Sequence, residues 1–254
     1  MKQHLSTIRG RVVRSLWADD GPCDAKALVV VLPGLGLTHY TRPTAAAVAS
    51  RGLSCAVLDL PGFGSDRPWP ARPDINAIGL TAARWVETHA PARPVVVLGH
   101  STGAQAALTA ALALGARRAG VSLVMAGPTF CPPQRRLTGL ALATTLAYRR
   151  DRPDELDPAE TWRGRAGILA ILGSGLRDAP DERIAHLKVP VTLTSGVDDA
   201  YAPFEWLDRL AASAVKAPRT RTARLGGSHN NLFTHPEQVA DLVVLAAQDA
   251  ATAH

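Results

Sequence analysis

One serine, Ser101, stands where the run VVVLGHSTGAQAAL at residues 95–108 changes from strand-like to helix-like composition. A serine hydroxyl is a weak nucleophile until a base takes its proton, so its chemistry would be attack on an acyl group with help from a histidine. Gly99 and Gly103 complete the pattern Gly-x-Ser-x-Gly, and small residues permit the tight strand-to-helix turn that such a serine needs. The N-terminal end of the following helix favours negative charge at the serine. The pattern therefore predicts a nucleophile at the end of a buried strand.

The base must come from one of eight histidines. His39, His229 and His235 remain once the terminal histidines, those at predicted helix ends and the neighbour of Ser101 are set aside. His229 lies in RLGGSHNNLFTHPEQV, where a predicted last strand meets a glycine loop before the last helix. Such a loop can carry an imidazole over the carboxyl edge of a sheet. His235 stands just before a proline and is interpreted as a capping or packing residue, so His229 is the preferred base.

An acid should orient this histidine and stabilise its charged form. The stretch PVTLTSGVDDAYAP places Asp198 and Asp199 just after a buried strand. The alternative position, after the strand at 121–126, reads AGPTF and holds no acid. The later pair is therefore favoured, and the chain order becomes nucleophile, acid, base.

The elements that must position these residues alternate along the chain. Continuous Val/Leu/Ala runs are typical of parallel strands buried on both faces by helices. We expect strands at 8–17, 27–32, 53–60, 94–99, 121–126, 189–195 and 219–225, and helices at 43–51, 73–90, 102–118, 204–215 and 236–249. This alternation predicts an α/β fold with a doubly wound, mostly parallel central sheet flanked by helices.

One segment breaks the alternation. Residues 129–188 contain no predicted strand and are interpreted as helices punctuated by prolines. Residues 1–128 and 189–254 then form the core domain, and 129–188 form an inserted helical lid over the carboxyl edge of the sheet. The alternative is an insertion that packs against the core and does nothing else.

Composition excludes several classes of function. The net charge of +6 comes from scattered basic residues, whereas a nucleic-acid interface would show a clustered basic stripe. Three cysteines are too few and irregular for a disulfide framework or a metal site, and no cofactor motif is present. No apolar run approaches the ~20 residues that cross a bilayer, and no secretory signal is visible. We expect a cytoplasmic protein without metal, cofactor, nucleic-acid or membrane partner; the oligomeric state is left open.

Taken together, five stretches resemble the α/β-hydrolase superfamily over essentially the whole chain. They are VLPGLG at 31–36, LDLPGFGSD at 58–66, GHSTG at 99–103, SGVDDAYAP at 195–203 and GGSHNNLFTHPE at 226–237. In related sequences the acid lies three residues after a glycine and four before a proline, so Gly196 and Pro203 select Asp199 over Asp198. The step from His229 to Pro236 also fits the family's catalytic histidine.

The resemblance also implies an oxyanion hole made of main-chain N–H groups. One donor would be Thr102, directly after the nucleophile, and the other Leu35, in the turn after the strand at 27–32. Family members commonly begin that turn with His-Gly, whereas this chain has Pro33-Gly34. The choice between Leu35 and Gly36 as the second donor therefore stays open.

A serine hydrolase that cleaves a carboxylic ester, lactone or thioester through an acyl-enzyme is the leading interpretation. Its substrate would be a small to medium, largely apolar molecule. Acyl transfer or cyclisation with the same three residues is the alternative chemistry, and a receptor-like ligand-binding protein with vestigial turnover is the alternative class. Candidate lining residues of the substrate pocket, which could equally form the lid's own core, are Gly34 in the turn and Phe130, Leu140, Tyr148, Trp162 and Leu169 in the insertion.

Overall fold

The computed structural model describes residues 1–18, 27–65, 68–136, 138–139, 143 and 157–252. Within these residues, eight strands form one sheet in the order β1-β2-β4-β3-β5-β6-β7-β8. The pairs β1/β2 and β2/β4 are antiparallel and all other pairs are parallel. The strands are β1 (Lys2–Ile8), β2 (Arg11–Trp17), β3 (Leu28–Leu32), β4 (Ser54–Asp59), β5 (Val95–His100), β6 (Val121–Ala126), β7 (Val191–Gly196) and β8 (Thr220–Leu225).

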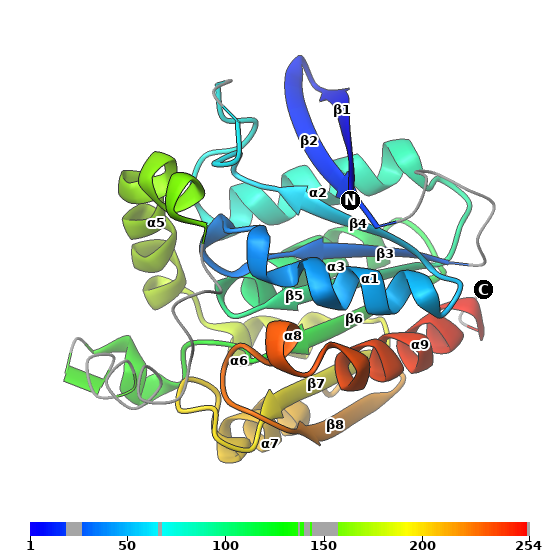
Figure 1. The fold of residues 1–254 in the computed structure, drawn as a ribbon. Helices are drawn as coiled ribbons and strands as arrows, with labels where there is room; N and C mark the ends of the chain where they lie inside the picture. Colours follow the sequence, from blue (N-terminus) through cyan, green and yellow to red (C-terminus); the bar gives the residue numbers. More distant parts are fainter. Residues whose placement is uncertain (19–26, 66–67, 137, 140–142, 144–156, 253–254) are drawn as a thin grey trace.

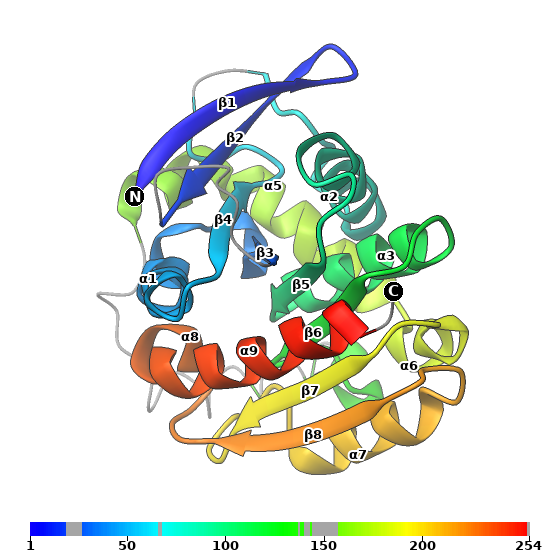
Figure 2. The ribbon, with the colours of Figure 1, turned by 90° about the vertical axis from the view of Figure 1, so that its right-hand side faces the viewer.

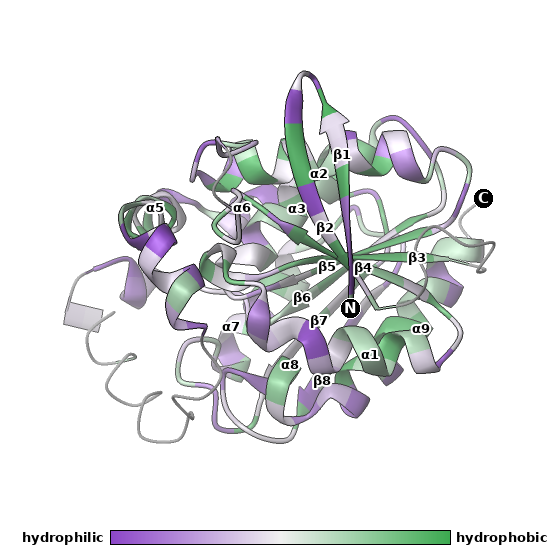
Figure 3. Cartoon of the chain, turned by 45° about the horizontal axis from the view of Figure 1, so that its top comes forward, coloured by the Kyte–Doolittle hydropathy of each residue, from purple (hydrophilic) through white to green (hydrophobic). Residues whose placement is uncertain are grey.

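The central strands are those with continuous aliphatic runs. Every residue of β3, β4, β5, β6 and β7 is buried, because helices cover both faces of this part of the sheet. The edge strand β8 instead alternates between exposed and half-buried residues up to its last residue, Leu225, which is buried. Figure 3 shows the central strands in green and the hydrophilic residues in purple on the surrounding helices and loops.

Helices lie on both faces of the sheet, as the sequence predicts. In Figure 2, α1 (Arg42–Ser50) and α9 (Pro236–Thr252) lie together on one face, and α2 (Ile75–His89) and α3 (Thr102–Gly115) lie on the other. Further α-helices are α5 (Pro158–Arg177), α6 (Pro180–Arg183), α7 (Phe204–Ser213) and α8 (Asn231–Thr234). Short 3-10 turns occur at Gly34–Gly36, His39–Thr41, Pro132–Arg135 and Ile184–His186. The doubly wound α/β architecture is confirmed.

The expected single strand at 8–17 is wrong. Arg9 and Gly10 both have positive φ, 49° and 75°, and reverse the chain in a two-residue turn. Lys2–Ile8 therefore pairs antiparallel with Arg11–Trp17, with Ile8 opposite Arg11. The glycine within an otherwise strand-like run was the local signal for this hairpin.

The described part of 129–188 is helical, and no strand occurs there between β6 and β7. Figure 1 shows α5 on the side of the sheet where β3 and β4 end, and α5 contacts the turn Gly34–Gly36 that follows β3. Its glycines permit close packing on the core, because a Cβ at Gly164 or Gly167 would lie within 2.6 Å of Phe63. No helix of the described residues is both long and apolar enough to cross a membrane.

Candidate active site

Ser101 occupies the sharp turn between β5 and α3. Its backbone has φ 56° and ψ −127°, a conformation that L-residues rarely adopt. The Ser101 N–H donates to the carbonyl oxygen of Ala126 at 3.0 Å, which fixes the turn to the end of β6. A strained residue held by its surroundings is frequent at functional sites.

The two motif glycines are required by neighbouring backbone. A Cβ on Gly103 would lie 2.2 Å from the carbonyl oxygen of Leu32, and one on Gly99 would lie 2.3 Å from that of Gly103. Only glycine therefore lets α3 start so close to β3 and β5. The sequence motif reflects this steric requirement.

Asp199 and His229 meet at the same edge of the sheet. The His229 Nδ1 lies 3.0 Å from both carboxylate oxygens of Asp199. The N–H groups of Tyr201 and Ala202 donate to the same carboxylate at 2.9 and 3.0 Å. Both side chains of the pair are buried. Burial alone would raise the pKa of Asp199, but His229 and the main-chain donor at Ala202 outweigh it and hold that pKa below its usual value.

His100, the residue before Ser101, joins this pair to the serine turn. Its ring lies 4.8 Å from the His229 ring, centroid to centroid. Its Nε2 lies 2.8 Å from the main-chain carbonyl oxygen of His229, and its Nδ1 lies 2.8 Å from the hydroxyl of Tyr40. Burial, and to a lesser extent the nearby His229, lowers the pKa of His100 to about 3, so the ring is neutral.

The neutral ring carries one proton, and its position follows from the partners. A carbonyl oxygen only accepts, so the proton is on Nε2 of His100 and Nδ1 accepts from Tyr40. The Tyr40 oxygen in turn accepts from the Gly34 N–H at 2.6 Å. This chain of hydrogen bonds connects the turn after β3, the serine turn and the loop of His229.

The turn after β3 lies against Ser101. A Cβ on Gly34 would be 2.8 Å from the Cβ of Ser101. The next residue, Leu35, has a positive φ of 53°, and its N–H donates to Oγ1 of Thr102 at 2.8 Å. The two residues expected to supply oxyanion donors are thus neighbours, and one donor already binds the side chain of the other.

A nucleophile turn, a buried carboxylate–imidazole pair and a tight turn after β3 at one sheet edge can together support acyl transfer. The family model described as "Alpha/beta hydrolase family" matches residues 29–242. The chain belongs to the α/β hydrolase family. It is 35% identical over 189 residues to the spectinabilin polyketide synthase system protein NorC of Streptomyces orinoci, a match that covers 73% of this chain and 8% of NorC. The chain spans well under two thirds of the length of the curated relatives that it matches.

Solved structures share the fold of this α/β hydrolase. A serine hydrolase involved in carbazole degradation, the CarC enzyme, superposes with a TM-score of 0.75 at 17% identity and covers 97% of this chain and 98% of its own. The thioesterase domain from the curacin biosynthetic pathway has a TM-score of 0.65 at 17% identity, covering 96% of this chain and 99% of its own. At such identities these matches establish the fold alone.

The expected lining residues occupy different environments in the hydrolase. Gly34 lies beside Ser101, but its N–H is already bound by Tyr40. Phe130 is buried against Gly175 of α5. Trp162 is 69% exposed on α5, with Arg165 over its ring. Leu169, on the same helix, is also 69% exposed; Leu140 and Tyr148 lie outside the described residues.

Four residues that the sequence did not single out belong to this site or its support. The Tyr40 hydroxyl connects the turn to His100, and the Tyr201 ring lies 4.7 Å from the His229 ring. Gly127 leaves room for the buried pair, since a Cβ there would lie 3.1 Å from Asp199 and 3.2 Å from His229. Glu160 of α5 accepts hydrogen bonds from the Thr38 N–H and hydroxyl. The glycine directly after a buried strand was a usable signal for Gly127; the other three have none.

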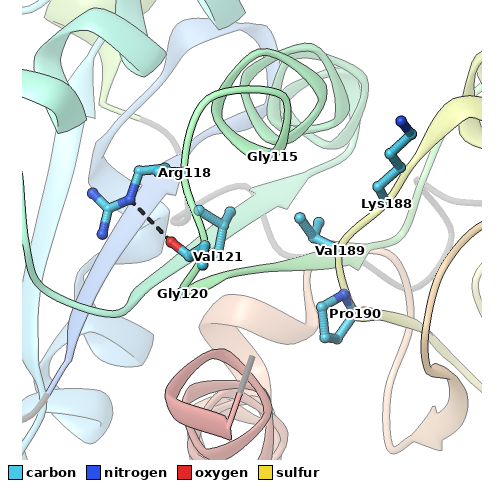
Figure 4. Close-up of a pocket in the computed structure, with 8 residues that line it drawn as sticks. Gly115, Arg118, Gly120, Val121, Lys188, Val189 and Pro190 are labelled. Carbon is cyan, nitrogen blue, oxygen red and sulfur yellow. Dashed lines mark hydrogen bonds between the residues drawn. The ribbon is translucent and has the colours of Figure 1, made fainter. Parts of the chain in front are cut away.

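A pocket of about 290 Å³ lies away from this edge (Figure 4). Its lining includes Gly115 at the end of α3 and the residues that precede β6 and β7, so it opens at the opposite edge of the sheet. Arg118 in its wall donates to main-chain carbonyls of Ala90, Arg93 and Ala119, which is a structural role. Among the described residues, no cluster of His, Cys, Asp and Glu could hold a metal ion.

Proposed function

We propose that this α/β hydrolase is a serine hydrolase that cleaves a carboxylic ester, lactone or thioester through an acyl-enzyme. Ser101 is the nucleophile, His229 the general base and acid, and Asp199 the acid that orients His229. The observation that carries the proposal is the strained Ser101 turn, whose preceding residue His100 binds the main chain of His229 in the buried His229–Asp199 pair.

The chemistry proceeds in two balanced halves. Ser101 Oγ attacks the carbonyl carbon while its proton passes to His229, and the carbonyl oxygen becomes negative. Collapse of this intermediate breaks the bond to the leaving alcohol or thiol, which receives the proton from His229. Water then attacks the acyl-enzyme, giving its proton to His229, and the acid product leaves as Ser101 regains a proton.

Main-chain donors at Thr102 and Leu35 would stabilise the negative oxygen. The carboxylate of Asp199 keeps its charge because its pKa is held low, so it can stabilise the imidazolium that forms on His229. The segment 129–188 serves in this proposal as a lid, because α5 lies at the carboxyl edge of the sheet (Figure 1).

The substrate is proposed to be a small to medium, largely apolar molecule. The relation to a polyketide synthase system protein and the fold shared with a curacin-pathway thioesterase domain favour inclusion of thioesters in the class. Cyclisation would follow if a hydroxyl of the acyl group, rather than water, attacked the acyl-enzyme.

Labelling with a fluorophosphonate probe, read by intact mass, tests the proposal. Wild type should gain one label, whereas Ser101→Ala should gain none and His229→Ala should react far more slowly. Ser50→Ala is the matched control, because Ser50 is an exposed serine at the end of α1 and its loss should leave labelling unchanged.

Ester, lactone and thioester panels of varied chain length then separate hydrolysis from its alternatives. A wild-type protein that gains no label, or a Ser101→Ala protein that still gains one, would contradict the proposal. A ligand-binding role would instead show tight binding with very slow turnover.

A further inference from the structure

The hydrogen bond from the Leu35 N–H to Thr102 Oγ1, 2.8 Å long, occupies a donor that the proposed oxyanion hole needs. Thr102 is the first residue of α3 and is 2% exposed. Leu35 sits in the left-handed region with φ 53° and ψ 13°, so the direction of its N–H is fixed. A carbonyl oxygen arriving at Ser101 therefore meets this N–H already bound to a hydroxyl.

A hydroxyl that accepts a hydrogen bond still has its own proton to donate. Threonines within helices usually donate to the carbonyl four residues earlier. Thr81 does so to Ala77, and Thr88 does so to Arg84. Thr102 begins its helix and has no such carbonyl, and among the described residues its hydroxyl donates to no acceptor.

The unused proton lies beside the main-chain donor. Oγ1 of Thr102 is three bonds from the Thr102 nitrogen, so hydroxyl and N–H occupy one small region next to Ser101. The first N–H groups of α3 have no carbonyl partner within the helix, so they are donors in the same region. The negative oxygen formed during acyl transfer is an acceptor that would arrive beside this hydroxyl.

We infer that the Thr102 side chain is a catalytic group. Its hydroxyl accepts from the Leu35 N–H and donates to the carbonyl oxygen as that oxygen becomes negative. The oxyanion is then held by the N–H and the O–H of Thr102. Leu35 acts through the hydroxyl, which its N–H polarises, in place of the direct donation to the oxyanion given above. The Thr102 proton stays on its oxygen throughout, since the proton lost by Ser101 goes to His229. This inference rests on the proposed serine-hydrolase function.

Threonine suits this role better than serine does. Its branched Cβ restricts rotation of the side chain, and the residue is buried, so the hydroxyl is held in place before the substrate arrives. Valine has nearly the same shape without the hydroxyl. Thr102→Val therefore removes the donor and also frees the Leu35 N–H.

Steady-state kinetics on a short-chain p-nitrophenyl ester test the inference with Thr102→Val, Thr102→Ala and Thr102→Ser. The expected result for Val is a fall in kcat of about 10²-fold with little change in KM, because the bond forms only in the transition state. Thr102→Ser should recover at least about tenfold of that loss, since it restores the O–H. Thr102→Ala removes the same O–H without added bulk, so poor folding of one variant leaves the other informative.

Thr81→Val is the matched control, because Thr81 is a buried threonine of α2 whose hydroxyl, among the described residues, makes only the ordinary helix bond to Ala77. Its kcat should stay near that of wild type. If folded Thr102→Val and Thr102→Ala keep or exceed the wild-type kcat, Leu35 is the direct donor and the inference is overturned.

Ser101→Ala in the same series separates the two claims. If Ser101→Ala is inactive while Thr102→Val is fully active, only the role of the Thr102 hydroxyl is wrong. If Ser101→Ala keeps the wild-type rate, the serine-hydrolase function fails, and the inference that rests on it fails too.

Discussion

The imidazole Nε2 of His100 donates a hydrogen bond to the main-chain carbonyl oxygen of His229 over 2.8 Å. His100 is fixed by the end of β5, whereas His229 lies in the loop after β8. The bond therefore connects the loop after β8 to the end of β5, a central strand of the sheet. It also requires a neutral ring, because Nδ1 of His100 must accept from Tyr40.

Replacing His100 should alter how stability depends on pH. The pKa of His100 is about 3 in the folded protein, against 6.5 for an unperturbed ring. Between these values the unfolded chain binds a proton that the folded protein does not, so folding stability falls as the pH drops from 6.5 towards 3. The loss approaches about 1.4 kcal/mol per pH unit within this window.

Urea unfolding of wild type and His100→Gln at several pH values measures this effect. The difference in free energy of unfolding between wild type and His100→Gln should shrink as the pH falls, at the rate per pH unit given above. Wild type loses this stability because His100 titrates, whereas glutamine does not. If the free energies of unfolding of wild type and His100→Gln change in parallel from pH 7 to pH 4, His100 binds its proton as well in the folded protein as in the unfolded chain, and the prediction is wrong.

Gly34→Ala should reduce activity while the fold persists. The added Cβ would lie 2.8 Å from the Ser101 Cβ and 3.0 Å from the Tyr40 hydroxyl, so the turn or the nucleophile must shift. A displacement of this order at reacting atoms can cost about 10²-fold in rate. Fluorophosphonate labelling rates measure the loss.

Gly173→Ala supplies the comparison for Gly34→Ala. Among the described residues, the nearest atom to a Cβ at Gly173 in α5 would be Nη1 of Arg177, at 3.5 Å. This variant should keep its labelling rate and gain about 0.5–1 kcal/mol of stability from the better helix former. Equal labelling rates for the two variants would show that the turn after β3 adapts to the extra methyl.

The elements were more predictable than the contacts between them. The runs at β3 and β5 read as buried strands because helices cover both their faces, and GHSTG predicts the turn at Ser101 because bulk is excluded there. These predictions need only the local sequence pattern. The same kind of pattern gave a wrong single strand at 8–17, because Gly10 permits a turn between two runs of strand-like residues.

Tyr40 and Glu160 could not be predicted from local pattern. Tyr40 matters because it meets His100, 60 residues along the chain, and Glu160 because it meets Thr38, 122 residues away. By sequence Glu160 is an ordinary acid in the first turn of a helix, where it favours the dipole. Glu160 becomes buried only through contacts that are distant in the sequence, so helix propensity and residue spacing do not indicate its role.

Glu160→Ala should detach α5 from the core. The carboxylate accepts from the Thr38 N–H at 2.7 Å and the Thr38 hydroxyl at 2.5 Å, and a third bond of 3.3 Å comes from the His39 N–H. Removal leaves buried donors without a partner, at a cost of about 2 kcal/mol. Urea unfolding and tryptic cleavage at Arg163 and Arg165 measure the change, and faster cleavage is expected.

The pH dependence of the Glu160 contribution has a defined sign. Burial raises the pKa of Glu160, and the Asp59 carboxylate raises it further, against the bonds from Thr38. Because the pKa of Glu160 is higher in the folded protein than in the unfolded chain, the folded protein binds the proton more tightly. The contribution of Glu160 to folding stability therefore falls as the pH rises above 4.5. The cost of Glu160→Ala should therefore be larger near pH 4 than near pH 7.

Glu182→Ala, at an exposed site on α6, is the control and should change neither stability nor cleavage. Cleavage of α5 at the wild-type rate in Glu160→Ala would show that the packing of its glycines on Phe63 holds the helix without the carboxylate.

Asp199→Asn and Asp198→Asn form a pair that decides which neighbouring acid serves His229. Asp199 is buried and lies 3.0 Å from the His229 Nδ1, whereas Asp198 is exposed. An amide at 199 removes the charge that stabilises the imidazolium and can turn its N–H towards Nδ1, favouring the wrong tautomer. The expected fall in kcat is about 10⁴-fold at neutral pH.

The control variant, Asp198→Asn, should keep a kcat within about twofold of wild type, as expected for a substitution at an exposed site. Ester hydrolysis by both variants, with unfolding midpoints to confirm that each is folded, makes the comparison, and a larger loss in Asp198→Asn would transfer the orienting role to Asp198.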